Sequence, residues 1–261
     1  MNVRVYVDFE ATGRVPQLEH IIQIGATSRV GEKTYEFEEL ARPKKHVSDE
    51  ICTITGLNRG DIEMASPVDA VLERFFQFLS GIPAESLTLV AYNGFAYDFP
   101  LLYHNCIKYG LSYSTMVTRC RILQHQDPLI WLRKQAKHAC MLRTRSGRAS
   151  FKLGDVYEAM FSERFDDAHT ALADARAMAR VCEEPEHVKG MFGEIPSGTL
   201  YTMFTTVFVC NMREAARTNA TNTGRAKKKK TRSTAAPPAM ILSSAMSNPL
   251  LEHLRSFPHQ D

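Results

Sequence analysis

The sequence predicts an α/β fold in which helices cover the faces of a mixed sheet. Three strand-like segments follow one another at the start of the chain, an order that favours an antiparallel meander. After them, apolar strand-like and amphipathic helical segments alternate, which is typical of parallel strands connected through helices. A meander followed by this alternation predicts one sheet with both antiparallel and parallel strands.

The three strands of the meander are predicted from short apolar runs. The first, 3–10, is rich in valine and aromatic residues, which have high strand propensity. The second and third, 20–26 and 33–40, are joined near Gly31, as expected for a turn between antiparallel neighbours.

Helix signals begin after the meander. Ser48 caps a predicted short helix that is stopped by Gly56. Ser66 reads as a second cap, with Pro67 at the first helical position. The helix that they open ends at Gly81, and it is amphipathic. Its apolar residues recur at spacings of three and four: Val68, Val71, Leu72, Phe75, Phe76 and Leu79.

The second half of the chain continues the alternation. An apolar run at 87–91 predicts a buried strand, and 99–109 predicts the helix after it. Further helices are predicted at 128–137 and 153–161. The segment 170–183 is the most alanine-rich helix.

Composition is that of an ordinary soluble globular protein. Of the 261 residues, 44% are apolar and 23% are charged. The six cysteines contain no C-x-x-C pair, which argues against a zinc site or a disulfide framework. We expect reduced thiols in an intracellular protein with no secretory signal and no membrane span.

Charge divides the chain into two parts. After Cys210 there are nine Lys or Arg and three acids, so this end carries +6 while the preceding part carries −3. From about residue 213 the composition shifts to Thr, Asn, Ala, Lys, Ser and Pro, which is typical of disordered segments. We therefore predict a folded domain at 1–212 and a basic, disordered tail at 213–261.

The first strand ends in a pair of acids. Because successive side chains of a strand point to opposite faces, Asp8 and Glu10 project the same way. Neighbouring carboxylates repel each other unless a cation lies between them, and Mg²⁺ or Mn²⁺ prefers such oxygen ligands. The alternative is a strand end that meets solvent.

Two further acids and a histidine stand at positions suited to a site. Asp98 follows a strand and the turn that begins at Asn93, and sites in α/β sheets assemble at the carboxyl ends of strands. Asp98 is expected to be the N-cap of the helix that it opens, and the alternative is that it has this role alone. Asp174 falls in the second turn of the alanine-rich helix. His169 lies just before the N-terminal end of that helix. An imidazole, with an ordinary pKa of about 6.5, can accept a proton there. The alternative is a capping or solvated histidine.

Together the motifs resemble those of the DEDDh 3′→5′ exonucleases, the DnaQ-like family of the RNase H-like superfamily. They are D-x-E at Asp8, N-x-x-x-x-D ending at Asp98 and H-x-x-x-x-D ending at Asp174, in that order. The segments most similar to the three-prime repair (TREX) branch are 89–102, 8–13, 54–57 and 153–157. The resemblance covers roughly residues 1–190 and implies an RNase H-like mixed sheet of five strands.

The resemblance implies hydrolysis of phosphodiester bonds at a 3′ end with two Mg²⁺ ions per site, for which Mn²⁺ can substitute. It assigns Asp8 to both metals and Asp98 to the second metal through water. Glu10 and Asp174 complete the first metal site. His169 is implied as the general base that deprotonates the attacking water. The expected products are nucleoside 5′-monophosphates.

The resemblance also implies where the substrate binds. The terminal nucleotide is expected against Glu10 and Ala11, with Tyr97 near the scissile phosphate. Leu18 and Ile54 are expected to wedge against terminal bases. The implied substrate-binding residues are Glu10, Ala11, Thr12, Asn93, Tyr97 and His169.

The branch implies particular partners. The expected substrate is DNA with a single-stranded or frayed 3′ end, and the expected assembly is a homodimer without membrane attachment. The chain departs from the branch at Tyr92, where histidine is frequent. We find neither a proline-rich insertion nor a membrane-anchoring tail, so partners and location are open.

Two basic segments favour nucleic acid as the partner. No acid occurs between Pro128 and Gly154, and we interpret the bases there as a backbone-binding strip; the alternative is a solvated helix face and loop. These bases are Arg133, Lys134, Lys137, Arg143, Arg145, Arg148 and Lys152. The run 225–232 fits a nuclear import signal, a nucleic-acid tether or a solvating charge run, so we expect the nucleus, the cytoplasm or both.

Three other functions fit the same motifs. An RNA 3′→5′ exonuclease would use the same chemistry. A catalytically silent nucleic-acid-binding adaptor is disfavoured because all five active-site residues are present. A proofreading subunit would act only within a polymerase complex.

Overall fold

The computed structural model describes residues 1–135, 150–164 and 170–184. All of them belong to the first of the chain's two units, Met1–Ala216. The predicted domain edge at residue 212 and the predicted tail lie outside the described residues and stay predictions.

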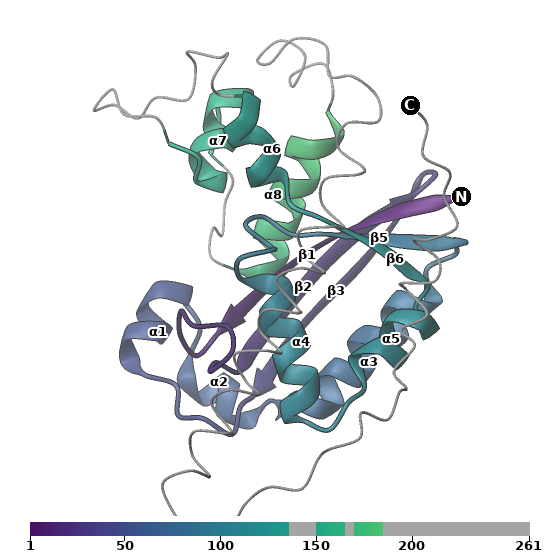
Figure 1. Ribbon diagram of the computed structural model, residues 1–261. Helices are drawn as coiled ribbons and strands as arrows, with labels where there is room; N and C mark the ends of the chain where they lie inside the picture. The colour runs from purple at the N-terminus through teal and green to yellow at the C-terminus, as the bar shows by residue number, and fades with distance from the viewer. Residues whose placement is uncertain (136–149, 165–169, 185–261) are drawn as a thin grey trace, which may run out of the picture. The chain divides into compact units, whose positions relative to one another are not determined.

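A single mixed sheet organises the described residues, in the strand order β4-β3-β2-β1-β5-β6 (Figure 1). The neighbours β1, β2 and β3 are antiparallel, whereas β5 pairs in parallel with both β1 and β6. The strands are β1 (Asn2–Ala11), β2 (Ile21–Val30), β3 (Lys33–Arg42), β4 (Ser66–Pro67), β5 (Ser86–Val90) and β6 (Ile122–Gln126). The predicted combination of an antiparallel meander with parallel strands is confirmed.

Two of these strands carry no clear pattern in the sequence. β6 supplies the fifth strand that the family resemblance implies, but its sequence Ile-Leu-Gln-His-Gln contains no apolar run. β4 adds a sixth strand of two residues, which pairs in parallel with the end of β3. The sheet is therefore one short edge strand wider than predicted.

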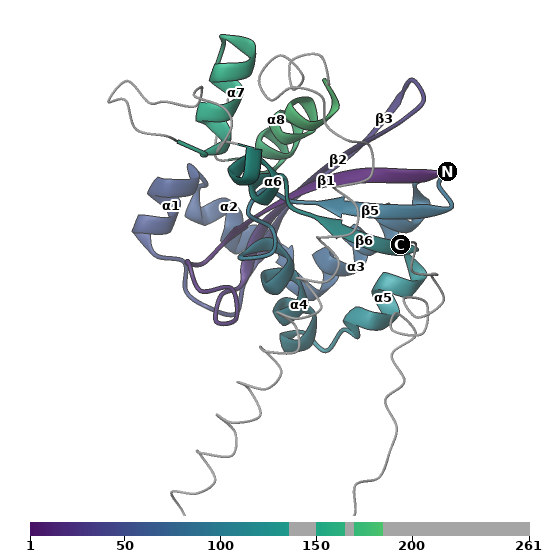
Figure 2. The same cartoon turned by 45° about the horizontal axis from the view of Figure 1, so that its top comes forward.

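Helices cover both faces of the sheet. They are α1 (Asp49–Thr55), α2 (Arg59–Met64), α3 (Val68–Gly81), α4 (Asp98–Lys108), α5 (Tyr113–Arg119), α6 (Pro128–Gln135), α7 (Leu153–Phe161) and α8 (Ala171–Glu183). Figure 2 shows α3, α4 and α5 on one side of the sheet and α6, α7 and α8 on the other. Among the described residues, no helix is long and apolar enough to cross a membrane.

The two faces of β1 pack against different helices. Phe9 meets Phe75 of α3 edge-on, with ring centroids 5.9 Å apart. Tyr6 packs with Met178 of α8 on the opposite face. Because side chains alternate along a strand, Asp8 and Glu10 share the face of Tyr6 and lie beneath α8.

The long amphipathic helix forms as predicted, but its start differs. All six apolar residues on which the prediction rests are buried in α3. Pro67 is the N-cap residue rather than the first helical residue, and the helix has no side-chain cap hydrogen bond. Ser66 and Pro67 instead form β4, opposite Ala41 and Arg42. This strand pairing holds their backbone extended, so the predicted Ser66 cap was wrong.

Capping residues were enough to predict α1 but not α2 or α5. α1 agrees with the prediction, because the Ser48 side chain accepts a hydrogen bond from Ile51 N and Gly56 ends the helix at a φ of 69°. α2 and α5 were not predicted, since helices of 6 and 7 residues display too little periodicity. Their caps, Asn58 and Ser112, were the available signals.

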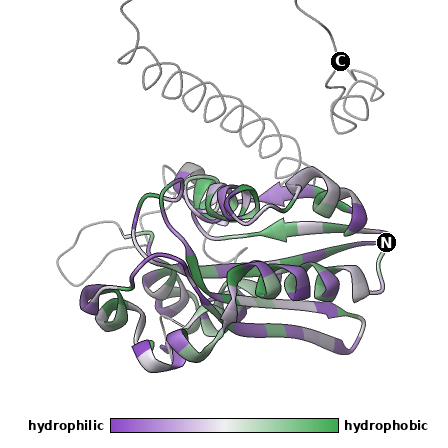
Figure 3. Cartoon of the chain, turned by 90° about the horizontal axis from the view of Figure 1, so that it is seen from below, coloured by the Kyte–Doolittle hydropathy of each residue, from purple (hydrophilic) through white to green (hydrophobic). Residues whose placement is uncertain are grey.

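The last three described helices form a second small core on the far side of the sheet from α3. α7 has the bounds that the sequence predicts. The buried residues of this cluster are Leu132, Val156, Tyr157, Met160, Ala177 and Val181. Figure 3 shows hydrophobic and hydrophilic residues alternating along the helices, as amphipathic packing requires. This cluster supports α8, the helix that carries Asp174.

Candidate active site

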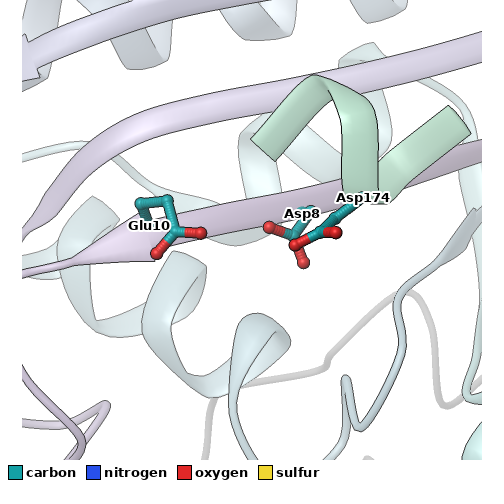
Figure 4. Close-up of side chains that lie close together, drawn as sticks. All are labelled: Asp8, Glu10 and Asp174. Carbon is teal, nitrogen blue, oxygen red and sulfur yellow. The ribbon is translucent and has the colours of Figure 1, made fainter. Parts of the chain in front are cut away.

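Three carboxylates meet where α8 crosses β1. One ligand atom from each of Asp8, Glu10 and Asp174 lies within 4.8 Å of the others, and all three residues are partly exposed. Figure 4 shows Asp8 and Asp174 pointing toward each other while Glu10 reaches the same space from farther along the strand. Three of the four acids that the sequence analysis groups together therefore lie close to one another, and their role as metal ligands stays a prediction.

A backbone irregularity accompanies the cluster. Glu10 pairs with Gln23 of β2, whereas the next residue, Ala11, pairs with Ile21, so the register shifts between them. Such bulges are frequent beside functional sites because they change the direction of a strand and re-aim its side chains. Here the shift comes directly after the second acid of the D-x-E motif.

Asp174 reaches the sheet because Gly25 lets α8 approach closely. Gly25 pairs with Asp8 across β1 and β2. A Cβ atom added to Gly25 would lie 2.1 Å from the carbonyl carbon of Ala171 and 2.2 Å from Leu172 N. Asp174 lies in the first turn of α8 rather than in the predicted second turn.

Asp98 lies at the start of α4, on a different element from the three clustered acids. It is the first residue of α4 and only 4% exposed, and Tyr97 occupies the N-cap position. The predicted N-cap role of Asp98 was therefore wrong. Asp98 lies outside the group of three whose ligand atoms are mutually close. Its charge nevertheless interacts with those of Asp8 and Glu10.

The electrostatics of the cluster favour protonation when no cation is bound. Burial, followed by the charges of Asp98, Asp174 and Glu10, raises the pKa of Asp8 well above its ordinary value. Burial and the Asp174 charge raise the pKa of Glu10 to about 7. Burial also raises the pKa of Asp98 well above its ordinary value, with added contributions from Asp127 and Glu10. For none of these three carboxylates does a positive charge among the described residues oppose the rise in pKa.

The turn before α4 is held by Asp127, which sequence reasoning missed. Its carboxylate accepts hydrogen bonds from Asn93 N at 3.0 Å, Phe95 N at 3.4 Å and Leu129 N at 3.0 Å. Burial raises the pKa of Asp127 to about 6, against the opposing effect of these backbone amides. An aspartate directly before Pro128 is a helix-start signal that could have identified it.

The other predicted substrate-binding residues lie near this end of the sheet. The Tyr97 hydroxyl donates to Gly13 O, and burial, followed by the charges of Asp98 and Glu10, raises its pKa. Asn93 adopts a φ of 60° in the turn before α4. Ala11 and Thr12 are buried at 5% and 7% exposure.

Of the other residues predicted to bind substrate, one already has a hydrogen-bond partner and some lie outside the described residues. The Thr12 hydroxyl donates to Glu19 Oε2 at 2.6 Å. Leu18 and Ile54 are 64% and 42% exposed, so their apolar surfaces remain available. His169 lies outside the described residues, as do the positions 137–148 of the predicted basic strip.

Comparison with known proteins assigns the family. A family model described as Exonuclease matches residues 5–182. The chain belongs to the exonuclease family. This is a family of 3′→5′ exonucleases, which are hydrolases that act on phosphodiester bonds.

Relatives of this chain include longer proteins. DNA polymerase III PolC-type of Thermotoga maritima is 31% identical over 179 residues, which are 68% of this chain and 11% of the polymerase. Human three-prime repair exonuclease 1 is 32% identical over 95 residues, which are 36% of this chain and 28% of that protein. The chain thus spans a small part of the length of either relative.

A solved structure shows the same fold. E. coli Exonuclease I in complex with a dT13 oligonucleotide superposes with a TM-score of 0.59 at 16% identity. The match covers 74% of this chain and 42% of that one.

The carboxylate cluster fits a divalent cation. Its donors are oxygen atoms only, which hard cations such as Mg²⁺ and Mn²⁺ prefer. Burial and the charges of neighbouring acids raise the pKa of Asp8 and Glu10, and a bound cation would offset both effects. Divalent metals are used by exonucleases of this family, and the acidic cluster is the place where this chain can hold them.

Proposed function

We propose that this chain is a metal-dependent 3′→5′ exodeoxyribonuclease of the DEDDh type, related to the three-prime repair branch. The observation that carries the proposal is the meeting of Asp8, Glu10 and Asp174 within 4.8 Å. Three anionic groups from a strand and a distant helix converge there at a cost in repulsion, and a bound cation removes that cost.

The chain's own residues have distinct roles in this proposal. Asp8, Glu10 and Asp174 hold divalent cations, and Asp98 contributes from the start of α4. When bound, two such cations neutralise charge on the phosphate and lower the pKa of the attacking water. His169 accepts the proton of that water as general base.

Substrate orientation is assigned to neighbouring groups. Ala11 lines the terminal nucleotide at the end of β1, and Tyr97 lies beside the scissile phosphate. The contact from the Tyr97 hydroxyl to Gly13 O supports this role, because it ties α4 to the loop after β1. Thr12 and Asn93 complete the proposed substrate contacts through their positions at the same end of the sheet.

DNA is the proposed substrate because the relatives' own names point to it. A DNA polymerase, a three-prime repair exonuclease and an Exonuclease I bound to a dT13 oligonucleotide all resemble this chain. We propose a single-stranded or frayed 3′ end as the form bound. RNA of the same sequence is the alternative substrate, and only direct comparison separates the two.

The deciding experiment compares matched DNA and RNA strands. The full chain is incubated with 5′-labelled oligonucleotides of one sequence in Mg²⁺, and released nucleotides are identified by chromatography. We expect stepwise shortening of DNA from the 3′ end with nucleoside 5′-monophosphates as products. Asp8→Asn is expected to abolish cleavage while the circular dichroism spectrum stays unchanged. Near-normal turnover in Asp8→Asn would contradict the metal assignment, and faster RNA cleavage would overturn the DNA assignment.

A second candidate is proofreading within a polymerase complex. The match to a PolC-type DNA polymerase over 68% of this chain favours it. The same experiment separates the candidates, because a chain that acts alone degrades free DNA, whereas a dependent subunit requires its polymerase.

Further features complete the proposal. We propose that residues 1–212 form the catalytic domain and that 213–261 form a basic tail that binds long DNA or directs nuclear import. We also propose a homodimer in solution. Removal of residues 213–261 should preserve cleavage of short oligonucleotides and reduce either nuclear accumulation or binding to long DNA.

A further inference from the structure

One buried amide connects the strand pair to the first turn of α8. Gln23 is 5% exposed, and its Oε1 accepts a hydrogen bond from Ala171 N at 3.1 Å. Its Nε2 donates to Glu38 Oε1 at 3.2 Å. An amide side chain offers one acceptor group and one donor group, so these two contacts use both of its functions.

The contact with Ala171 lies at the N-terminal end of α8. Ala171 is the first residue of α8, and the first N–H groups of a helix have no partner within the helix. Gln23 supplies a partner from β2, a strand far away in the sequence. The start of α8 is thereby attached to the sheet.

The attachment point lies opposite the proposed metal ligands. Gln23 pairs with Glu10 across β1 and β2, and Gly25, two residues farther along, pairs with Asp8. Side chains at positions 23 and 25 therefore share the face on which the two acids lie. Asp174 follows Ala171 by three residues, within the same first turn. The contact of Gln23 therefore joins this turn to the strand beside Asp8 and Glu10.

We propose that Gln23 is a positioning residue for the metal site: its contact with Ala171 N fixes the first turn of α8, and so places the Asp174 carboxylate against Asp8 and Glu10. The inference rests on the proposed function in one respect, that these carboxylates bind a divalent cation. Gln23 itself touches neither substrate nor metal in this proposal. Residues that hold ligands in place typically change metal affinity or activity by about 10- to 100-fold when mutated.

The first test is Gln23→Met, which keeps the side-chain length but offers Ala171 N no strong acceptor. Binding of Mn²⁺ alone is measured by electron paramagnetic resonance and calorimetry on the full chain. We expect about 10- to 100-fold weaker Mn²⁺ binding. Unfolding temperature in chelator is measured in parallel to separate lost positioning from lost folding.

A matched control breaks another polar contact of the same helix. The Tyr6 hydroxyl donates to Glu183 Oε1 at 3.1 Å, at the far end of α8. Tyr6→Phe removes this contact without touching the first turn, so we expect wild-type Mn²⁺ affinity. Equal losses of affinity in Tyr6→Phe and Gln23→Met would overturn the proposal, because general attachment of α8 would then explain both.

A rescue variant keeps the proposal testable if Gln23→Met unfolds. In Gln23→Glu combined with Glu38→Gln, the carboxylate at position 23 accepts from Ala171 N, and the amide at position 38 donates to it. Because the pair keeps an acceptor for Ala171 N and a polar contact between positions 23 and 38, we expect it to bind Mn²⁺ with nearly wild-type affinity. A folded pair that binds Mn²⁺ about 10-fold or more weakly than wild type would overturn the proposal, because the acceptor for Ala171 N is then not what sets the affinity.

The outcomes also separate this inference from the function on which it rests. Wild-type protein that binds no Mn²⁺ would overturn the proposed metal-dependent function together with this inference. Tight Mn²⁺ binding that is lost in Asp8→Asn but unchanged in Gln23→Met would overturn this inference alone.

Discussion

Asp8 and Gly25 face each other across β1 and β2, and the first turn of α8 rests on Gly25. One residue of this pair carries charge, and the other carries no side chain at all. The missing side chain lets Ala171 and Leu172 come close enough to the sheet for Asp174 to reach Asp8. The close approach and the carboxylate cluster are therefore two aspects of one packing arrangement.

Gly25→Ala should disrupt the acidic cluster without altering any acid. The new methyl group would meet backbone atoms of Ala171 and Leu172 at 2.1 to 2.4 Å, so α8 must move away from the sheet. Such overpacking costs about 1–3 kcal/mol of unfolding free energy. We expect a lower unfolding temperature and weaker Mn²⁺ binding, measured by calorimetry. Gly81→Ala is the control, because a Cβ atom there meets no atom within 4 Å.

The sequence predicted the parts of the site that are local and missed those that depend on packing. The alternation of a strand suffices to place Asp8 and Glu10 on one face. Gly25 looks like any glycine in a strand until α8 is seen above it. The roles of Gln23 and Asp127 likewise depend on partners that are distant in the sequence, Ala171 and Asn93.

The same distinction holds for the fold. α3 was predictable because 14 residues display a full amphipathic stripe and α7 because its apolar residues recur on one face. β6 was not, because its buried His125 is polar and its apolar content is low. β4 exists through its pairing with β3, which local propensity cannot reveal.

Mg²⁺ should stabilise the protein more at alkaline than at acidic pH. The pKa of Glu10 is raised from 4.5 to about 7 in the folded chain, and those of Asp8 and Asp98 are raised as well. In metal-free protein the folded state thus holds protons that the unfolded state releases, so stability falls as the pH rises through about 4.5 to 7. A bound cation removes this loss by neutralising the anionic carboxylates.

The measurement is the unfolding temperature in chelator and in Mg²⁺ across a pH series. We expect Mg²⁺ to raise the unfolding temperature slightly at a pH of about 5 and more strongly at a pH of about 8. Ca²⁺ should stabilise as well but support little hydrolysis. Asp8→Asn should be more stable than wild type in chelator at alkaline pH. If Mg²⁺ raised the unfolding temperature equally at every pH, the proposed repulsion between the carboxylates would be contradicted.

His125 should make the protein acid-sensitive for a reason unrelated to the active site. Burial lowers the pKa of His125 to about 3, and its Nε2 lies 2.9 Å from the Tyr113 hydroxyl. As the pH falls below the unfolded-state pKa of about 6.5, the unfolded chain takes up a proton that the folded chain refuses. Stability should therefore fall with decreasing pH by up to about 1.4 kcal/mol per pH unit.

The test replaces the titrating ring with a neutral group that keeps a polar contact. His125→Gln is compared with wild type by urea unfolding in Mg²⁺ at pH values from about 7 to 5. We expect the wild type to lose more unfolding free energy over this range than the variant does. Parallel losses in the two proteins would show that another group controls acid sensitivity.

His169→Ala should separate proton transfer from metal binding. His169 is proposed as the general base, and it precedes the first residue of α8, Ala171, by two positions. Loss of a general base typically lowers turnover by about 10²- to 10⁴-fold. Mn²⁺ affinity should stay near the wild-type value, because the proposal gives His169 no metal contact. Asp174→Asn is the matched control on α8 and should weaken Mn²⁺ binding strongly.

The pH profile of the same variant decides the assignment. Only neutral imidazole accepts a proton, so wild-type turnover should rise with pH through about 6.5 and then level off. His169→Ala should remove that acidic limb from its residual activity. If the acidic limb of the pH profile stayed unchanged in His169→Ala, another group would be the one that titrates. Glu10 would be the first candidate, because its pKa of about 7 falls in the same range. Saturating Mg²⁺ distinguishes the two, since a bound cation lowers the pKa of a carboxylate ligand and would shift a Glu10 limb toward acid.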